Sequence, residues 1–383
     1  MEKSLKIIRP VGNPIVLAKG PLDYTQFGGF HIEFYHSGTS ALAAAILAVK
    51  RLRPTKNVNP EIILPAYACP DLISAVAYAG CTPILVDLAP DTCWMSLTDI
   101  ENHISENTIA IIAVRFLGIA ERMEQLKALC EKHELILIED SAQGFPVTNP
   151  GTYWRGDVNI LSFGRGKPIN MLAGGAVLTK VEAIKNHLIL PSPHIDKSSE
   201  STKYLLKVFA YNILINPFIY GIALNLPGLS IGETIFKPLP HIANIPGCIT
   251  DRINANINAY RKLPNKSLEI KQIIESLKSL EITDLAVSSQ HEFSNPLLRY
   301  PLLVKDKATR DSLHKALMQL GSSIMYQQPL YKIRNIPAAV GMQNINFVHA
   351  DNFANRLITL PTHKDVSNNI LDEIFARIRQ IIE

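Results

Sequence analysis

Four short stretches of the sequence contain residue types that could do chemistry. SGTS (37–40) stands directly before a predicted helix, and Glu139-Asp140 ends the most apolar predicted strand. Lys167 lies in the loop GRGK (164–167), and a glycine pair (174–175) opens a further strand. SGTS could simply cap its helix, but glycine, hydroxyls and free N–H groups at a helix start also bind phosphate. The glycine pair indicates either a turn or a close approach of backbone to a ligand.

Asp140 and Lys167 are the two groups with reactive side chains. A carboxylate at the end of a buried strand caps the following turn or pairs with a cation such as a protonated ring nitrogen. A loop lysine is usually solvated, but at a sheet edge its amine can be desolvated, which lowers its pKa and lets it form a Schiff base. The loop resembles a phosphate loop, yet Pro168 occupies the hydroxyl position, which disfavours a nucleoside triphosphatase.

The elements that must position these groups alternate between helix and strand from residue 37 to residue 180. Helices are predicted over 40–53, 71–80 and 121–133, and apolar strands over 61–65, 82–88, 108–114 and 135–140. Runs that are apolar throughout are typical of a parallel sheet buried on both faces. The pattern predicts a doubly wound α/β domain, in which ligands bind at the carboxyl ends of the strands.

The chain is expected to form a large domain over 1–250 and a smaller C-terminal α+β domain over 251–383. The small domain is predicted from a strand at 297–304 and from helices at 308–321 and 368–383. The segment 203–236 is strongly apolar, but its uninterrupted runs are shorter than the roughly 18 residues of a transmembrane helix. Two helices joined near Asn216-Pro217 fit it better. They are either a buried or dimer-interface pair or a surface that meets a membrane or an apolar substrate.

Composition narrows the function classes. Thirty-eight basic and 34 acidic residues give a net charge of +4, and the basic residues are dispersed, so no nucleic-acid partner is expected. The 11 histidines form no H-x-x-x-H pair, so no metal site is expected. Five scattered cysteines without a C-x-x-C pair, and a start without an apolar signal segment, predict a cytoplasmic protein.

In this order, the stretches resemble the DegT/DnrJ/StrS family of pyridoxal-phosphate-dependent aminotransferases. These enzymes have fold type I and mostly act on nucleotide-linked keto sugars. The resemblance covers most of the chain and includes SGTSAL, LPAYACPDLISAVAYAGCTPILVDLAPDT, LILIEDSAQGF, SFGRGK and ANRLITLPTHKDVS. Ser162 stands five residues before Lys167, and the glycine pair follows seven and eight residues after it, as in the family.

The resemblance implies a role for each matching residue. Lys167 would form the Schiff base with pyridoxal phosphate and then move a proton between the substrate and the cofactor. Asp140 would bind the ring nitrogen, and Gln143 would contact the 3-oxygen of the ring. Cys69, or the nearby Tyr67, would pack on the ring face. The phosphate would be held by Gly38, Thr39, Ser40 and Ser162.

Several positions depart from the family pattern. Pro168 replaces the usual asparagine, Leu172-Ala173 replaces Gly-Glu, and Gly164 and Arg115 stand where histidines are common. The family's Gly-Tyr-Asn-Tyr-Arg stretch, which reaches the partner subunit's site, is not found; the apolar segment and HIANIPG (241–247) lie in that region. Lys167 itself argues against the family's dehydratases, which have histidine there. Cofactor binding is therefore expected to be kept, whereas sugar recognition does not transfer.

The expected protein is a homodimeric aminotransferase with pyridoxal phosphate as its cofactor. It would move an amino group from a donor such as glutamate to a keto group on a nucleotide-linked sugar, for polysaccharide or antibiotic biosynthesis. Two alternatives stay open. One is a pyridoxal phosphate enzyme with a non-sugar or lipid-linked acceptor, which could use membrane contact through 203–236. The other is a pyridoxal-phosphate-binding regulator without turnover.

Overall fold

A computed structural model of the protein describes residues 7–54, 59–189, 198–224, 234–277, 281–337 and 346–383. The larger of its two sheets has seven strands in the order β1-β7-β6-β5-β4-β2-β3. Strands β2 to β6 pair in parallel, whereas β7 runs antiparallel between β6 and β1. The strands are β1 (His31–Tyr35), β2 (Glu61–Pro65), β3 (Thr82–Val86), β4 (Thr108–Val114), β5 (Ile136–Asp140), β6 (Val158–Ser162) and β7 (Gly175–Thr179).

Helices cover both faces of this sheet, as its continuous apolar strands require. In β2, Ile62 and Leu64 join the core cluster of α1 (Gly38–Leu52) and α2 (Asp71–Tyr78). Ile63, between them, joins the cluster of α3 (Leu97–His103) and α4 (Met123–Lys132) on the other face. Side chains alternate across a strand, so one apolar run serves both layers. The predicted doubly wound α/β architecture is confirmed.

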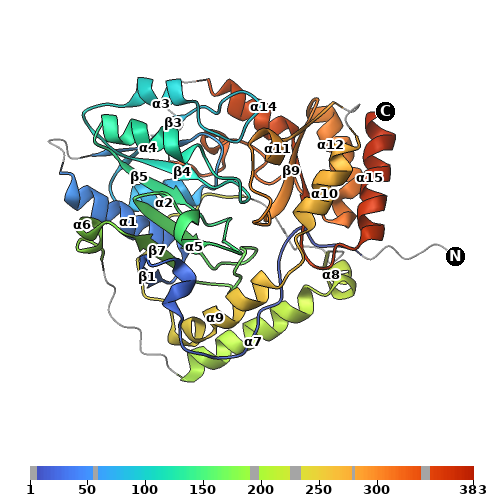
Figure 1. Ribbon diagram of the computed structural model, residues 1–383, viewed down its shortest axis with the longest axis horizontal. Coiled ribbons are helices and arrows are strands. Elements are labelled where there is room, and N and C mark those ends of the chain that lie inside the picture. Colours follow the sequence, from blue (N-terminus) through green and yellow to red (C-terminus); the bar gives the residue numbers. More distant parts are fainter. Residues whose placement is uncertain (1–6, 55–58, 190–197, 225–233, 278–280, 338–345) are drawn as a thin grey trace.

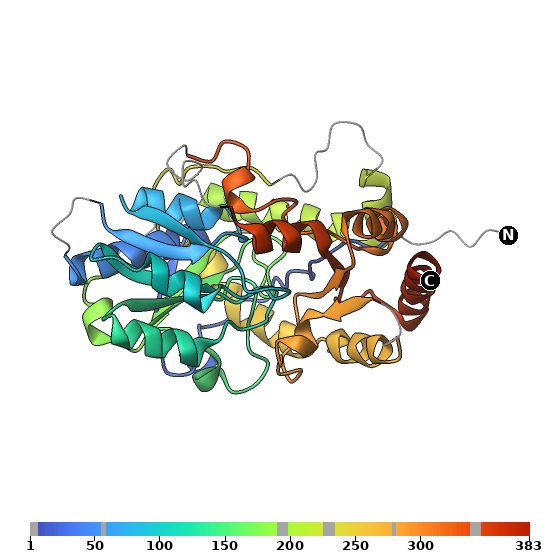
Figure 2. The same cartoon turned by 90° about the horizontal axis from the view of Figure 1, so that it is seen from above.

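The C-terminal elements form a second layered unit beside the large sheet (Figures 1 and 2). Its antiparallel sheet has the order β10-β9-β8. The strands are β8 (Ile282–Asp284), β9 (Arg299–Val304) and β10 (Leu357–Pro361). The helices of this unit are α10 (Lys266–Glu275), α11 (Leu285–Ser288), α12 (Lys307–Leu317), α14 (Val348–Arg356) and α15 (Asn368–Ile382). The buried residues of α15 fall at Leu371, Ile374, Phe375 and Ile378, the spacing of one helix face.

The domain boundary expected at residue 250 falls inside helix α9 (Gly247–Arg261). Ile249, Ile253 and Ile257 of this helix share a core cluster with Leu178 of β7. A helix whose apolar face packs under the large sheet belongs to that unit. We therefore propose that the large domain continues to the end of α9.

Two helices occupy the apolar segment, and they meet where the sequence predicts. Helix α7 spans Ser198–Leu214, and α8 spans Pro217–Leu224. Residues 225–233 of the predicted apolar segment lie outside the described residues. Within the described part of the chain, no helix has the length and hydrophobicity needed to cross a membrane. Helix α7 runs along the edge of the molecule, below α9 in Figure 1.

Candidate active site

A cavity lies at the carboxyl ends of β4, β5 and β6, where a doubly wound sheet is expected to bind its ligand. The empty space in it is about 600 Å³ when the part open to solvent is included. Seven of the eight predicted site residues line it: Gly38, Thr39, Cys69, Asp140, Gln143, Ser162 and Lys167. The sequence motifs therefore meet in one place although they span 130 positions of the chain.

Ser40 is the predicted residue that the structure places elsewhere. Its side chain is fully buried, and its Oγ lies 3.0 Å from Nδ1 of His36. Its backbone N–H donates to Oγ of Ser37, the N-cap of α1, over 3.1 Å. Both polar groups of Ser40 thus serve the helix cap rather than the cavity. Tyr67, the alternative to Cys69, is buried behind the cavity wall, and its hydroxyl donates to the backbone oxygen of Tyr326.

The start of α1 meets Ser162 closely enough to require glycine at position 38. A Cβ atom there would lie 2.7 Å from Cβ and 2.9 Å from Oγ of Ser162. The first N–H groups of a helix have no partners within the helix. Here the N–H of Ser40 donates to Ser37, whereas Gly38 and Thr39 line the cavity next to Ser162. This arrangement can bind an anion such as a phosphate.

The glycine pair supports the same site from behind. A Cβ at Gly175 would lie 2.5 Å from the backbone nitrogen of Gly38, and Gly174 has a φ of +99°. The close approach that the pair permits is therefore between β7 and the start of α1. The glycine pair therefore lies against the backbone at the start of α1, and not against a ligand as the sequence also allowed.

Asp140 ends β5 and its carboxylate faces the cavity. Its Oδ1 accepts a hydrogen bond from the N–H of Ala142 over 2.9 Å. Burial raises the pKa of Asp140, while the Ala142 hydrogen bond and the positive charge of Lys167 lower it less. A buried carboxylate in this position gains most from a cation placed beside it.

Lys167 enters the cavity from the loop that follows β6. The backbone N–H of Lys167 donates to the backbone oxygen of Gly164 over 3.3 Å, and Gly166 takes the left-handed conformation with a φ of +77°. Among the described residues, no hydrogen bond or ion pair engages its Nζ atom. The amine is therefore free to react with a ligand in the cavity.

Gln143 is fixed from two sides. Its Oε1 accepts from the N–H of Leu117 over 2.7 Å, and its Nε2 donates to the hydroxyl of Tyr326 over 3.1 Å. Tyr326 lines the cavity from the C-terminal unit, and sequence reasoning missed it because no local motif surrounds it. Asp71, at the start of α2, also lines the cavity and was not predicted.

Glu139, next to Asp140, points away from the cavity. Its Oε1 lies 2.6 Å from Nη2 of Arg115, and both side chains are almost fully buried. Its Oε2 accepts from the N–H groups of Arg155 and Gly156. The arginine that replaces the family's histidine thus balances a buried charge behind the site.

Replacing Glu139 with glutamine is expected to lower the free energy of unfolding by about 3 kcal/mol or more, because it leaves a buried guanidinium without its counter-charge. Urea unfolding of the cofactor-free protein measures this change. Glu101→Gln is the matched control, since Glu101 pairs with Lys132 in solvent and its loss should change stability by less than about 1 kcal/mol. Equal effects of the two substitutions would show that the buried pair contributes no more than a surface pair.

Comparison with known proteins supports the fold. Solved structures of similar fold include PseC of Helicobacter pylori, an aminotransferase involved in the biosynthesis of pseudoaminic acid. It matches 97% of this chain and 99% of its own at a TM-score of 0.68 and 17% identity. NtdA of Bacillus subtilis with bound cofactor PMP matches 92% of this chain and 73% of its own at a TM-score of 0.68 and 19% identity. The fold is that of the fold type I pyridoxal phosphate enzymes.

The DegT/DnrJ/EryC1/StrS aminotransferase family model matches residues 30–223 and 260–379, so the chain belongs to this family. GDP-perosamine synthase of Escherichia coli O157:H7 is 36% identical over 145 residues, which are 37% of this chain and 38% of the relative. The dTDP-4-amino-4,6-dideoxy-D-glucose transaminase of Shigella dysenteriae is 25% identical over 359 residues, covering 92% of this chain and 86% of the relative. The first relative is thus matched over less than half of its length.

Proposed function

We propose that this protein is a pyridoxal-phosphate-dependent aminotransferase that transfers an amino group from an amino acid such as glutamate to a keto group of a nucleotide-linked sugar. The observation that supports this most strongly is one cavity in which the amine of Lys167 and the buried carboxylate of Asp140 meet the start of α1. Family membership and the names of the nucleotide-sugar relatives support the class of acceptor.

The cavity residues fit the polar parts of pyridoxal phosphate. Gly38, Thr39 and Ser162 offer N–H groups and hydroxyls to its phosphate, and the Gly38 cradle leaves no room for a side chain. Asp140 offers a buried negative charge to the protonated ring nitrogen, and Gln143 offers an N–H to the 3-oxygen. Cys69 would lie against the ring face. Ser40 has no part in this proposal because its polar groups are engaged in the cap.

Each of these residues then has a definable task. Bound pyridoxal phosphate supplies an aldehyde for an amine and a ring that accepts the electron pair of a broken C–H bond. Asp140 would keep the ring nitrogen protonated, because a buried carboxylate stabilises a neighbouring cation. Lys167 would bind the aldehyde when no substrate is present, and its released amine would move the proton between the substrate Cα and the cofactor. Gln143, held by Leu117 and Tyr326, would orient the ring.

We also propose that two copies assemble as a homodimer, as in the family, and that the protein is cytoplasmic. The free thiols of all five cysteines fit a reducing compartment.

A visible spectrum of the purified protein with pyridoxal phosphate, followed by titration with glutamate, tests the first half of the reaction. The proposal expects loss of the visible absorbance and formation of one 2-oxoglutarate per site. A spectrum that glutamate leaves unchanged would favour a regulator that binds the cofactor without turnover. Mass spectrometry of nucleotide-linked keto sugars incubated with the glutamate-treated protein then tests the acceptor.

Gly38→Ala is expected to raise the dissociation constant of pyridoxal phosphate about tenfold, because the new methyl group overlaps Ser162 and displaces the start of α1. An absorbance titration of the cofactor-free protein measures it. Gly164→Ala in the lysine loop is the matched control, since its Cβ would lie 3.4 Å from Oγ of Ser162, an ordinary contact. Similar constants for the two variants would argue against a phosphate site at the start of α1.

A further inference from the structure

Helix α7 has one face packed against the protein. Tyr204 and Val208 are buried there in the core cluster beside α9, and Ile215, directly after the helix, is buried as well. Asn212 binds the N-terminal segment through two hydrogen bonds of 2.9 Å with the N–H and the oxygen of Ile15. These contacts define which side of the helix faces inward, so the opposite side is its outer face.

The outer face of the α7–α8 hairpin is apolar. It comprises Leu206, Phe209, Ile213, Leu214 and Phe218, whose side chains are between 40% and 76% exposed. Positions 206, 209 and 213 follow the three- and four-residue spacing of a helix stripe. Five of the twelve large hydrophobic residues exposed on the described surface fall within these 13 positions. Exposed hydrophobic residues are normally scattered, so this cluster indicates an interaction surface.

The charge on this face is positive. Lys203 and Lys207 are exposed beside the apolar stripe, and residues 201–221 contain no aspartate or glutamate; Glu200, in the first turn of α7, is half-buried. No ion pair with another described residue holds either lysine. A second copy of the same face would bring apolar groups but no carboxylate, and so would leave these ammonium groups dehydrated without partners. Anionic lipid supplies both an apolar layer and phosphate groups for the lysines.

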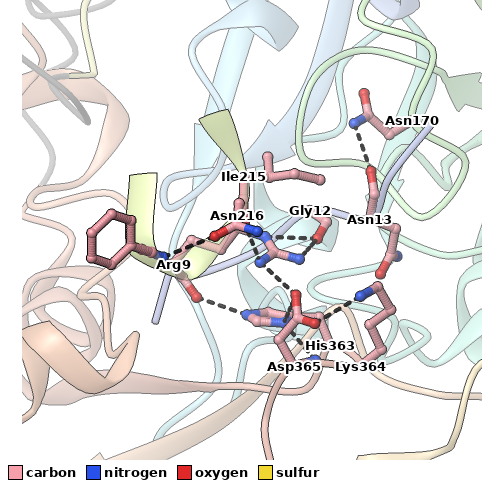
Figure 3. A network of polar contacts seen from close by, with 10 residues as sticks. Arg9, Gly12, Asn13, Asn170, Ile215, Asn216, His363, Lys364 and Asp365 are labelled. Atoms are coloured by element: carbon pink, nitrogen blue, oxygen red, sulfur yellow. Dashed lines mark hydrogen bonds and ion pairs between the residues drawn. The ribbon is translucent and has the colours of Figure 1, made fainter. Parts of the chain in front are cut away.

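The hairpin is also held firmly at its corner. Arg9 donates through Nη1 to the backbone oxygen of Ile215 over 2.8 Å and is paired with Asp365 at 2.6 Å (Figure 3). The N–H of Phe218 donates to Oδ1 of Asn216 over 3.1 Å. Phe218, the most exposed of the five, is therefore presented by an anchored turn, which lowers the entropy lost when it inserts into another phase.

We propose that the outer face of the α7–α8 hairpin docks the protein on the surface of a membrane that contains anionic lipid. Seventeen residues of helix measure about 25 Å. The helix would lie in the plane of the interface, with its apolar stripe among the acyl chains and its lysines at the phosphates. This inference is independent of the reaction proposed above.

Flotation of the full-length protein with lipid vesicles tests the proposal. Vesicles of phosphatidylcholine with phosphatidylglycerol should bind the protein, and those of phosphatidylcholine alone should bind it at least tenfold more weakly. Raising the salt concentration should release it. Phe209→Ser with Phe218→Ser should weaken binding at least tenfold. Lys203→Gln with Lys207→Gln should weaken binding to the anionic vesicles about twenty-five-fold, or about fivefold for each lysine.

Met318→Ser with Val348→Ser is the matched control, because these side chains are 52% and 54% exposed in the C-terminal unit. This variant should bind vesicles like the wild type, and circular dichroism should verify that every variant is folded. The proposal would be overturned if the phenylalanine variant still bound vesicles, or if binding did not depend on anionic lipid. Absence of wild-type binding would overturn it as well. If the wild type does not bind vesicles, and the phenylalanine variant has a lower mass than the wild type in analytical ultracentrifugation, the face is a contact between copies of the chain.

Discussion

Lys167→Ala is expected to lower amino transfer by at least about a thousandfold and to abolish covalent retention of pyridoxal phosphate. The substitution removes the amine that binds the aldehyde and moves the proton, and no other lysine lines the cavity described here. Single-turnover reaction with glutamate measures the loss. Reduction with borohydride followed by mass spectrometry measures covalent attachment.

Lys127→Ala is the control for this substitution, since Lys127 is an exposed residue of α4 remote from the cavity lining. It should retain both activity and the covalent cofactor. A Lys167→Ala protein that still forms the covalent adduct would refute the assigned role of this lysine. Addition of a small primary amine should restore part of the proton transfer in Lys167→Ala, which loss of fold would not allow.

Asp140→Asn is expected to lower turnover by about a hundredfold or more, the scale of losing one preorganised electrostatic contact. The amide cannot keep the ring nitrogen protonated. In the cofactor-free protein the same substitution should raise stability, because burial raises the pKa of Asp140 and its charge therefore opposes folding at neutral pH. A carboxylate with a purely structural role would give the opposite result.

The pH dependence gives this prediction a sign. The pKa of Asp140 is raised in the folded protein above the ordinary value of 3.8 that applies when the chain is unfolded. The charge of Asp140 therefore destabilises the folded protein increasingly as the pH rises above 3.8 toward the raised pKa, and this effect vanishes at lower pH. Urea unfolding of the two cofactor-free proteins should show an advantage for Asp140→Asn at pH 7 that shrinks toward pH 4. An Asp140→Asn protein that is less stable than wild type at pH 7 would contradict the assignment.

Sequence patterns predict the parallel part of the fold well, because each buried strand is a continuous apolar run. Strand β1 escapes such reasoning, since HIEFY mixes polar and half-buried residues at the sheet edge and pairs with β7 more than 130 positions away. The motif residues reach the cavity because strand ends meet at one edge. Ser40 does not, because its position on the first turn of α1 directs it into the core.

Side-chain partners that are remote in sequence lie beyond local patterns. Tyr326 meets Gln143 across 183 positions, and Arg115 meets Glu139 by way of neighbouring strands. The two helices of the apolar segment follow from its prolines and asparagines. Which face of these helices stays in solvent depends on contacts with Arg9 and Ile15, about 200 positions earlier in the sequence.

The contact of Gly175 with the start of α1 also bears on how the chain folds. Gly38 lies more than 120 positions before both Ser162 and Gly175, and the three residues come together only when β7 pairs between β6 and β1. Helix α1 can form early from its own alanines, but its anion-binding end exists only after this long-range antiparallel pairing closes. During refolding, the protein should therefore bind the cofactor late, only after β7 has paired with β6 and β1.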